Sequence, residues 1–147
     1  MRVSTKGRYG TRAMLDVALH ADEGLVHLKD VAERQEVSKK YLEHLVARLE
    51  ADGLLRTVRG AGGGVALTKP PSEVTILDIL CTLEGSSSPV ECVDRPEVCS
   101  RSVNCGARDL WAELGGVMTE FLGSVTLEDP CERQSGKEEP AALTYHI

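Results

Sequence analysis

The stretch "VHLKDVAERQEVSKKYLEHLVARLEADGLLRTVRGAGGGVAL", residues 26–67, decides the fold. Apolar residues recur at helical spacing on both sides of "QEVS", and Ser38 is a candidate N-cap for the second of two amphipathic helices. Val37 in the turn is apolar and would pack between them. The pattern predicts a helix-turn-helix, whose second helix can enter a DNA major groove. An ordinary helical hairpin with a solvated charged face is the alternative for this segment alone.

The residues after the second helix favour DNA binding. Gly53 suits the position that ends a helix, "LLRTV" and "VAL" are typical of short strands, and "RGAGGG" is typical of the tip between them. Helix, turn, helix and hairpin is the order of a winged helix. Arg59 would then reach a minor groove, and Gly60 and Gly62 would let the backbone approach phosphates. A nucleotide-binding loop is disfavoured because the run lacks a Lys-Ser/Thr ending and precedes a strand.

Further helices are predicted on both sides of this unit. Upstream, "STKGRYGTRAMLDVALH" (residues 4–20) carries Lys6 and Tyr9 near its start, and we assign both to the DNA-binding face. Downstream, "PSEVTILDILCTLEG" (residues 71–85) opens with Pro and has Ser72 as a candidate N-cap. Cys81 falls inside this apolar helix, where its expected role is that of a small buried hydrophobe.

A last predicted helix has more apolar surface than a small domain needs. In "ARDLWAELGGVMTEFLGSV" (residues 107–125) the apolar stripe includes Leu110, Leu114, Val117 and Phe121. Its expected use is pairing with the same helix of a second chain, which gives a homodimer. The predicted fold is therefore mainly α with a small β-hairpin wing: a winged helix-turn-helix plus a long C-terminal dimerisation helix.

These elements predict four consecutive regions. Residues 1–84 form the DNA-binding domain, residues 85–106 a cysteine-rich loop, and residues 107–126 the dimerisation helix. Residues 127–147 are polar and frequent in Pro and Glu, which predicts a disordered tail. Cys131 in that tail is expected to be an incidental exposed thiol.

Composition narrows the function classes. Residues 1–70 hold 12 Lys and Arg against 9 Asp and Glu, whereas residues 71–147 hold 5 against 14, so positive charge is concentrated in the predicted DNA-binding half. No signal peptide or membrane span is expected, which predicts a cytoplasmic protein without membrane contact. Four scattered histidines and the lack of a Ser-His-Asp candidate or a phosphate loop argue against an enzyme.

The segment "CVDRPEVCSRSVNC" places Cys92, Cys99 and Cys105 within fourteen residues. Thiolates suit both zinc and iron–sulfur clusters. Structural zinc sites usually contain C-x2-C pairs, whereas the intervals here are six and five residues, which better suit a larger cluster on a pliable loop. Zinc binding and a cluster-free thiol sensor remain alternatives.

Several segments together resemble one family. "MRVSTKGRYG", "AMLDVAL", the stretch from "ERQEVSKKYLEH" to "GGGVAL", the three-cysteine loop and the following "LW" helix are similar to the IscR/NsrR-type (Rrf-two) family of dimeric winged-helix transcriptional regulators. The resemblance covers Met1 to about Leu127. It implies a homodimer that binds double-stranded DNA at a pseudo-palindromic operator under the control of an iron–sulfur cluster, with two irons favoured over four. The alternative is a cluster-free regulator that acts through a protein partner, for example a cysteine-metabolism enzyme, or through thiol oxidation.

The resemblance also assigns roles to individual residues. The cluster ligands would be Cys92, Cys99 and Cys105, and Arg59 would enter the minor groove. The recognition helix would present to DNA Ser38, Lys39, Lys40, Tyr41, Glu43 and His44. Two departures concern the fourth cluster ligand, because Arg108 stands where some relatives have a histidine and Arg8 where another branch has an acidic residue. A carboxylate from Asp109, Glu97 or Asp94, a residue of the partner chain or a small thiol would then complete the set.

Overall fold

The structure is a computed structural model that describes residues 3–138. It confirms a mainly helical winged-helix fold with one two-stranded antiparallel sheet. Short 3-10 turns connect several of the longer elements. The helices and strands are α1 (Thr5–Leu19), α2 (Leu28–Gln35), α3 (Lys39–Ala51), β1 (Leu55–Val58), β2 (Gly64–Leu67), α4 (Ile76–Glu84), α5 (Glu91–Asp94), α6 (Gly106–Ser124) and α7 (Glu128–Glu138).

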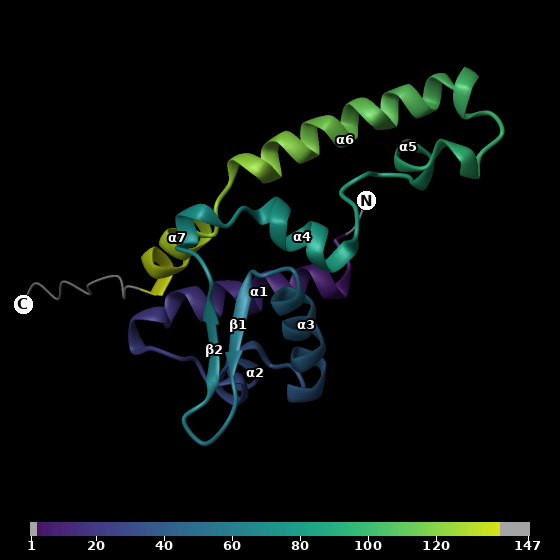
Figure 1. Cartoon of the computed structure of the whole chain (residues 1–147). Helices are drawn as coiled ribbons and strands as arrows, with labels where there is room; N and C mark the ends of the chain where they lie inside the picture. Colours follow the sequence, from purple (N-terminus) through teal and green to yellow (C-terminus); the bar gives the residue numbers. More distant parts are fainter. Residues whose placement is uncertain (1–2, 139–147) are drawn as a thin grey trace, which may run out of the picture.

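Helix α4 lies between the winged domain and the long helix α6 (Figure 1). The hydrophobic core lies among α1, α3 and α4, where Met14, Leu42, Leu45 and Leu83 are inaccessible to solvent or nearly so. Full burial of a side chain of this size contributes about 1.5–3 kcal/mol. Helix α6 runs out from this core and carries α5 near its far end, opposite the tip of the wing (Figure 1).

The helix-turn-helix is confirmed at its turn. Helix α2 ends at Glu36, whose left-handed backbone (φ 55°) reverses the chain, and the Val37 N–H donates to the Ala32 carbonyl at 3.0 Å. Ser38 is the N-cap of α3, and its hydroxyl accepts from the Tyr41 N–H at 3.2 Å. This local geometry sets the direction of α3 relative to α2.

Backbone hydrogen bonds join the wing to the segment just before α2. Leu55 pairs with Leu67 and Val58 with Gly64, and Val26 forms an isolated bridge to Val65 with N–O distances of 2.9 and 2.8 Å. A Cβ on Gly64 would lie 2.6 Å from the Val26 carbonyl oxygen, so this approach requires glycine. The wing is therefore held at a fixed place beside the helix-turn-helix.

Two expectations about α4 are wrong. The N-cap is Thr75, which forms a capping box with Asp78: each side chain accepts a backbone N–H of the other at 3.0 Å. Ser72 lies instead in a 3-10 turn before the helix. Cys81 is exposed, because it lies on the face of α4 opposite Ile79 and Leu83, which are buried.

The predicted disorder of the tail is also wrong for Glu128–Glu138, which form α7. Leu127 is fully buried, and its N–H donates to the Val74 carbonyl at 2.8 Å. Cys131 is half-buried against the core, and this burial raises the pKa of its thiol, so it is not an exposed thiol. The rest of the predicted tail, residues 139–147, lies outside the described residues.

Candidate DNA interface, cysteine loop and pairing helix

The outer face of α3 is polar and solvent-exposed. Lys39, Lys40, Glu43 and His44 are exposed, whereas Leu42 and Leu45 fill the core from the opposite face. The Lys39 ammonium lies 3.6 Å from the Glu43 carboxylate. Exposed pairs of this kind contribute at most about 1 kcal/mol, so Lys39 can exchange this partner for a phosphate at little cost.

Tyr41 differs from its neighbours on α3. It is half-buried, and its ring meets the Tyr9 ring edge-on with centroids 6.2 Å apart. Its hydroxyl is buried and has no hydrogen-bond partner within residues 3–138. In this arrangement the Tyr41 ring packs against Tyr9 of α1, and its contact with DNA stays a prediction.

The first half of α1 adds basic groups next to this tyrosine pair. The guanidinium carbons of Arg8 and Arg12 lie 5.0 and 5.2 Å from the centroid of the Tyr9 ring, within cation–π range. Arg12 also donates from Nε to the Gln35 side chain at 2.8 Å, which ties α1 to the end of α2. Lys6 is exposed in the first turn of α1. The start of α1 is thus a basic surface beside α3.

A groove of about 320 Å³ lies where α2, α3 and the wing meet. Lys39 and Glu43 line it from α3, and Arg59 and Gly60 line it from the wing. Gly62 is exposed nearby in the same hairpin. Sequence reasoning missed His27 and Lys29, which line the groove from the start of α2. Their position directly before a helix-turn-helix is the signal that could have suggested them.

A buried carboxylate fixes α2 against α1. Asp16 is 3% exposed and accepts hydrogen bonds from Arg34 Nη2 at 2.6 Å and Nε at 3.0 Å and from Gln35 Nε2 at 2.8 Å. The hydrogen bond with Asp16 raises the pKa of Arg34. His20 Nδ1 lies 3.5 Å from the same carboxylate. Sequence reasoning missed this cluster, which sets where α2 and therefore α3 lie.

The cysteine loop folds into short turns at the far end of α6. Cys92 lies in α5, Cys99 follows a 3-10 turn, and Cys105 directly precedes α6; all three are half-buried free thiols. Within the described residues no group of three or more His, Cys, Asp or Glu side chains is arranged to hold a metal ion. The loop therefore brings the three cysteines to one region without joining their thiols in one ligand set.

Arg108 and Ser102 hold this loop together. Arg108 donates from Nε to the Cys92 carbonyl at 2.8 Å, which binds α5 to the first turn of α6. The Ser102 hydroxyl is buried within 2.6 and 2.7 Å of the Pro96 and Cys99 carbonyl oxygens. Arg108 thus supports the loop through hydrogen bonds, and its guanidinium has no lone pair to donate to a metal.

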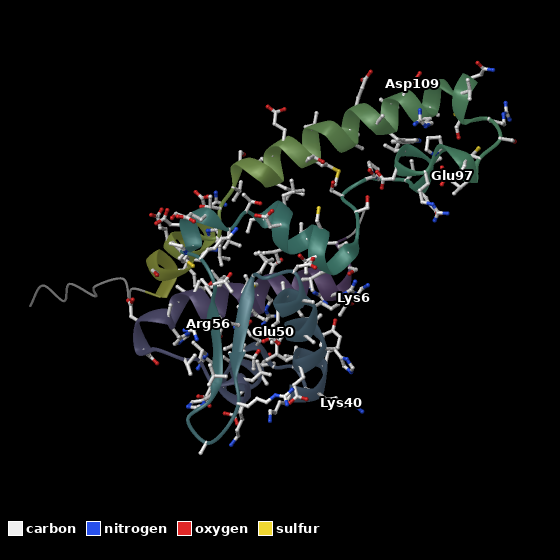
Figure 2. The ribbon with its side chains drawn as sticks, in the orientation of Figure 1. Lys6, Lys40, Glu50, Arg56, Glu97 and Asp109 are labelled. Carbon is white, nitrogen blue, oxygen red and sulfur yellow. The ribbon has the colours of Figure 1, made fainter. Side chains whose placement is uncertain are left out.

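The three carboxylates that could supply a fourth cluster ligand differ in whether they already have a partner. Both oxygens of Asp94 accept hydrogen bonds from the Ser86 and Ser88 hydroxyls, and these bonds lower the pKa of Asp94. Glu97 pairs with Arg95 at 3.3 Å. Asp109 is exposed in the first turn of α6. Figure 2 places Glu97 and Asp109 at the end of the molecule remote from Lys40 on α3.

Helix α6 exposes a wide apolar face. Leu110, Val117 and Phe121 are 56%, 65% and 64% exposed, and Trp111 is also exposed. Leu114, on the same side of the helix, is half-buried. Large exposed apolar patches usually mark interaction surfaces. Pairing with a second α6 stays a prediction. It requires an exposed apolar face, which α6 has.

Comparisons with known proteins agree with this architecture. Residues 3–133 match the Rrf2 family, described as an iron-dependent transcriptional regulator. The chain belongs to the Rrf2 family. It is 42% identical over 134 residues to the HTH-type transcriptional regulator IscR of Photorhabdus laumondii, across 91% of this chain and 81% of that protein. It is therefore a transcriptional regulator of helix-turn-helix type and not an enzyme.

Two solved structures are also similar to this chain. CymR, the global cysteine regulator of B. subtilis, aligns with a TM-score of 0.75 and 38% identity over 90% of this chain and 98% of that one. T. potens IscR aligns with a TM-score of 0.76 and 36% identity over 94% and 91%. Within residues 3–138 no helix is long and apolar enough to cross a membrane.

Proposed function

We propose that the protein is a homodimeric regulator that binds a pseudo-palindromic operator in the cytoplasm and changes its affinity when an iron–sulfur cluster occupies Cys92, Cys99 and Cys105. The observation that carries the proposal is the pairing of two features in one chain. A basic winged helix lies at one end, and three half-buried free thiols lie in one loop at the other end.

The DNA-binding part of the proposal rests on the groove between α3 and the wing. Lys40 and His44 would enter the major groove with α3, and Lys39 would contact a phosphate. Arg59 would reach the adjacent minor groove, where the potential is most negative. Lys6 and Arg8 would contact phosphates from the start of α1. Pairing of two α6 helices would place two such units on half-sites about 34 Å apart, one turn of DNA.

The cluster-binding part rests on the donor chemistry of the loop. Three thiolates suit cluster iron, and the intervals of six and five residues do not form a zinc knuckle. The three thiols must converge to bind one cluster, so binding would reorder the loop that Arg108 and Ser102 hold. A bound cluster would supply a redox-sensitive and oxygen-labile link between these thiols. Asp109 would be the leading carboxylate for the fourth position, because Asp94 and Glu97 already have partners.

The test is the colour of the protein purified without oxygen. A cluster gives visible absorption, and Cys92→Ala, Cys99→Ala and Cys105→Ala should each abolish it. Cys81→Ala and Cys131→Ala are matched controls that should retain it, because neither thiol belongs to the loop: one lies on α4 and the other is half-buried against the core. Equal loss of absorption in a control variant would exclude this ligand set.

A cluster-free regulator is the second candidate, and one observation favours it. CymR, described as a global cysteine regulator, is as similar in structure to this chain as T. potens IscR is. In this case the chain would respond through a protein partner or through thiol oxidation. A colourless anaerobic preparation with normal operator binding, which loses affinity on peroxide treatment or on addition of a cysteine-metabolism enzyme, would support it.

A further inference from the structure

One carboxylate joins the end of α4 to the start of α1. Glu84 Oε1 accepts hydrogen bonds from the backbone N–H groups of Ser4 and Gly7, both at 3.2 Å, and from the Ser4 hydroxyl. The first N–H groups of a helix have no partner within the helix, and the helix dipole makes this end positive. Glu84 therefore acts as an additional cap for α1 from 77 to 80 residues away in the sequence.

The two helices are built for this close approach. A Cβ on Gly7 would lie 2.4 Å from Glu84 Oε1, and a Cβ on Gly10 would lie 2.1 Å from Leu83 Cδ1. Glycine is unfavourable inside a helix, so its use at both positions is explained by the contact with α4. Among the described residues no Lys or Arg pairs with Glu84, which leaves its carboxylate to the α1 amides.

A short segment connects Glu84 to the cysteine loop. It is the last residue of α4, and Gly85 turns the chain with φ 87°. The hydroxyls of Ser86 and Ser88 then donate to Asp94, which lies in α5 together with Cys92. On the other side of Glu84, the first turn of α1 carries Lys6, which lies beside the end of α4 in Figure 2.

We infer that Glu84 is a positioning residue that couples the conformation of the cysteine loop to the DNA-facing first turn of α1. The inference rests on the proposed function, because that proposal assigns Lys6 and Arg8 of α1 to the DNA surface. In the observed fold, the Asp94 contacts hold the segment after Gly85, and Glu84 caps α1. A change at Cys92 that breaks the Asp94 contacts would release the end of α4 and weaken the cap.

The test is a double-mutant cycle on the full-length protein without a cluster. NMR hydrogen exchange is measured for the Ser4 and Gly7 amides in the wild type, Glu84→Ala, Asp94→Ala and the double variant. Exchange should become roughly five- to tenfold faster in Glu84→Ala, as expected for loss of a helix cap, and about two- to threefold faster in Asp94→Ala. The double variant should exchange no faster than Glu84→Ala, because Asp94 acts through Glu84.

Two variants separate positioning from general destabilisation. Glu84→Gln keeps an acceptor oxygen without the charge, so its exchange should be intermediate. Glu73→Ala removes an exposed carboxylate from the turn before α4 and should leave the Ser4 and Gly7 amides unchanged. Additive effects of Glu84→Ala and Asp94→Ala, or no change in exchange in Glu84→Ala, would overturn the inference.

Operator binding distinguishes this inference from the proposed function. Glu84→Ala should weaken binding about three- to tenfold and reduce the slope of log K against log salt by about one, since Lys6 loses its phosphate contact. If the wild type binds no DNA, the proposed function fails and the exchange cycle still decides the coupling. If the wild type binds DNA and Glu84→Ala has the same operator affinity and the same hydrogen-exchange rates, the inference about Glu84 fails while the proposed function stands.

Discussion

Replacement of Asp16 by Ala tests whether one buried carboxylate positions the recognition helix. Asp16 is 3% exposed and joins α1 to the end of α2 through Arg34 and Gln35. A hydrogen bond to a charged group contributes about 1.5–3 kcal/mol and a neutral one about 0.5–1.5 kcal/mol. The Arg34 side chain is 36% exposed, so water can hydrate its guanidinium when Asp16 is lost. The contribution of its hydrogen bonds to stability therefore lies at the lower end of the range for charged groups. The free energy of unfolding should therefore fall by roughly 2–4 kcal/mol.

The assay is urea unfolding at one fixed protein concentration, because the stability of the proposed dimer would depend on concentration. The expected fall in the unfolding free energy of Asp16→Ala corresponds to a fall in Tm of roughly 5–12 °C for a chain of this size. Lys29→Ala is the matched control on α2, because its pair with Glu33 joins side chains that are 76% and 68% exposed. That variant should change stability by less than about 0.5 kcal/mol.

Arg34→Ala completes the test by a second double-mutant cycle. If the ion pair holds α2, Asp16→Ala and Arg34→Ala should be coupled by about 1–3 kcal/mol. Operator affinity should fall in parallel under conditions where both variants are folded, since α2 sets the place of α3. A loss below about 0.5 kcal/mol in Asp16→Ala would refute the reasoning, and so would a coupling energy near zero.

Three further predictions address the interface, the wing and the fourth ligand. Phe121→Glu would bury a charge in the pairing face of α6, so sedimentation should show monomers with weak operator binding, while the exposed control Glu113→Ala stays dimeric. Arg59→Ala should weaken binding most at A·T-rich flanks in a gel-shift series, whereas Lys39→Ala should weaken all sites equally; a uniform effect of Arg59→Ala would remove it from the minor groove. Asp109→Ala should alter the cluster spectrum and speed its loss in air without abolishing it, and an unchanged spectrum would leave a partner-chain or exogenous ligand.

The helix-turn-helix and the wing could be predicted because their signals are local. Ser38 lies three residues before the N–H that it caps, and Gly53 follows the helix that it ends with φ 75°. The wing glycines lie between two short apolar runs and allow a turn that other residues would strain. In these segments the residues that determine the geometry are within a few positions of one another, so sequence pattern and structure agree.

The features that the sequence analysis missed depend on contacts between distant segments. Asp16 and Arg34 are 18 positions apart, and Ser4 and Glu84 are 80 apart, so no local pattern joins them. The polar composition after Val125 suggested disorder, yet Leu127 fills a place in the core next to Val74. A local signal was present there, because Asp129 accepts the Thr126 N–H at 2.8 Å in a helix-capping pattern.

The proposed cluster site and the proposed DNA surface lie far apart, and α4, which packs against α1, α3 and α6, lies between them. Two routes are physically distinct. In one, α6 changes how the two protomers are spaced, and only binding to a full two-half-site operator responds. In the other, Glu84 changes the first turn of α1 within a protomer, and binding to a single half-site responds as well. A Phe121→Glu monomer separates them, because its affinity for one half-site should still fall when Asp94→Ala is added if the Glu84 route operates. Fluorescence anisotropy with a half-site duplex measures this effect, and an unchanged affinity would assign the coupling to protomer spacing alone.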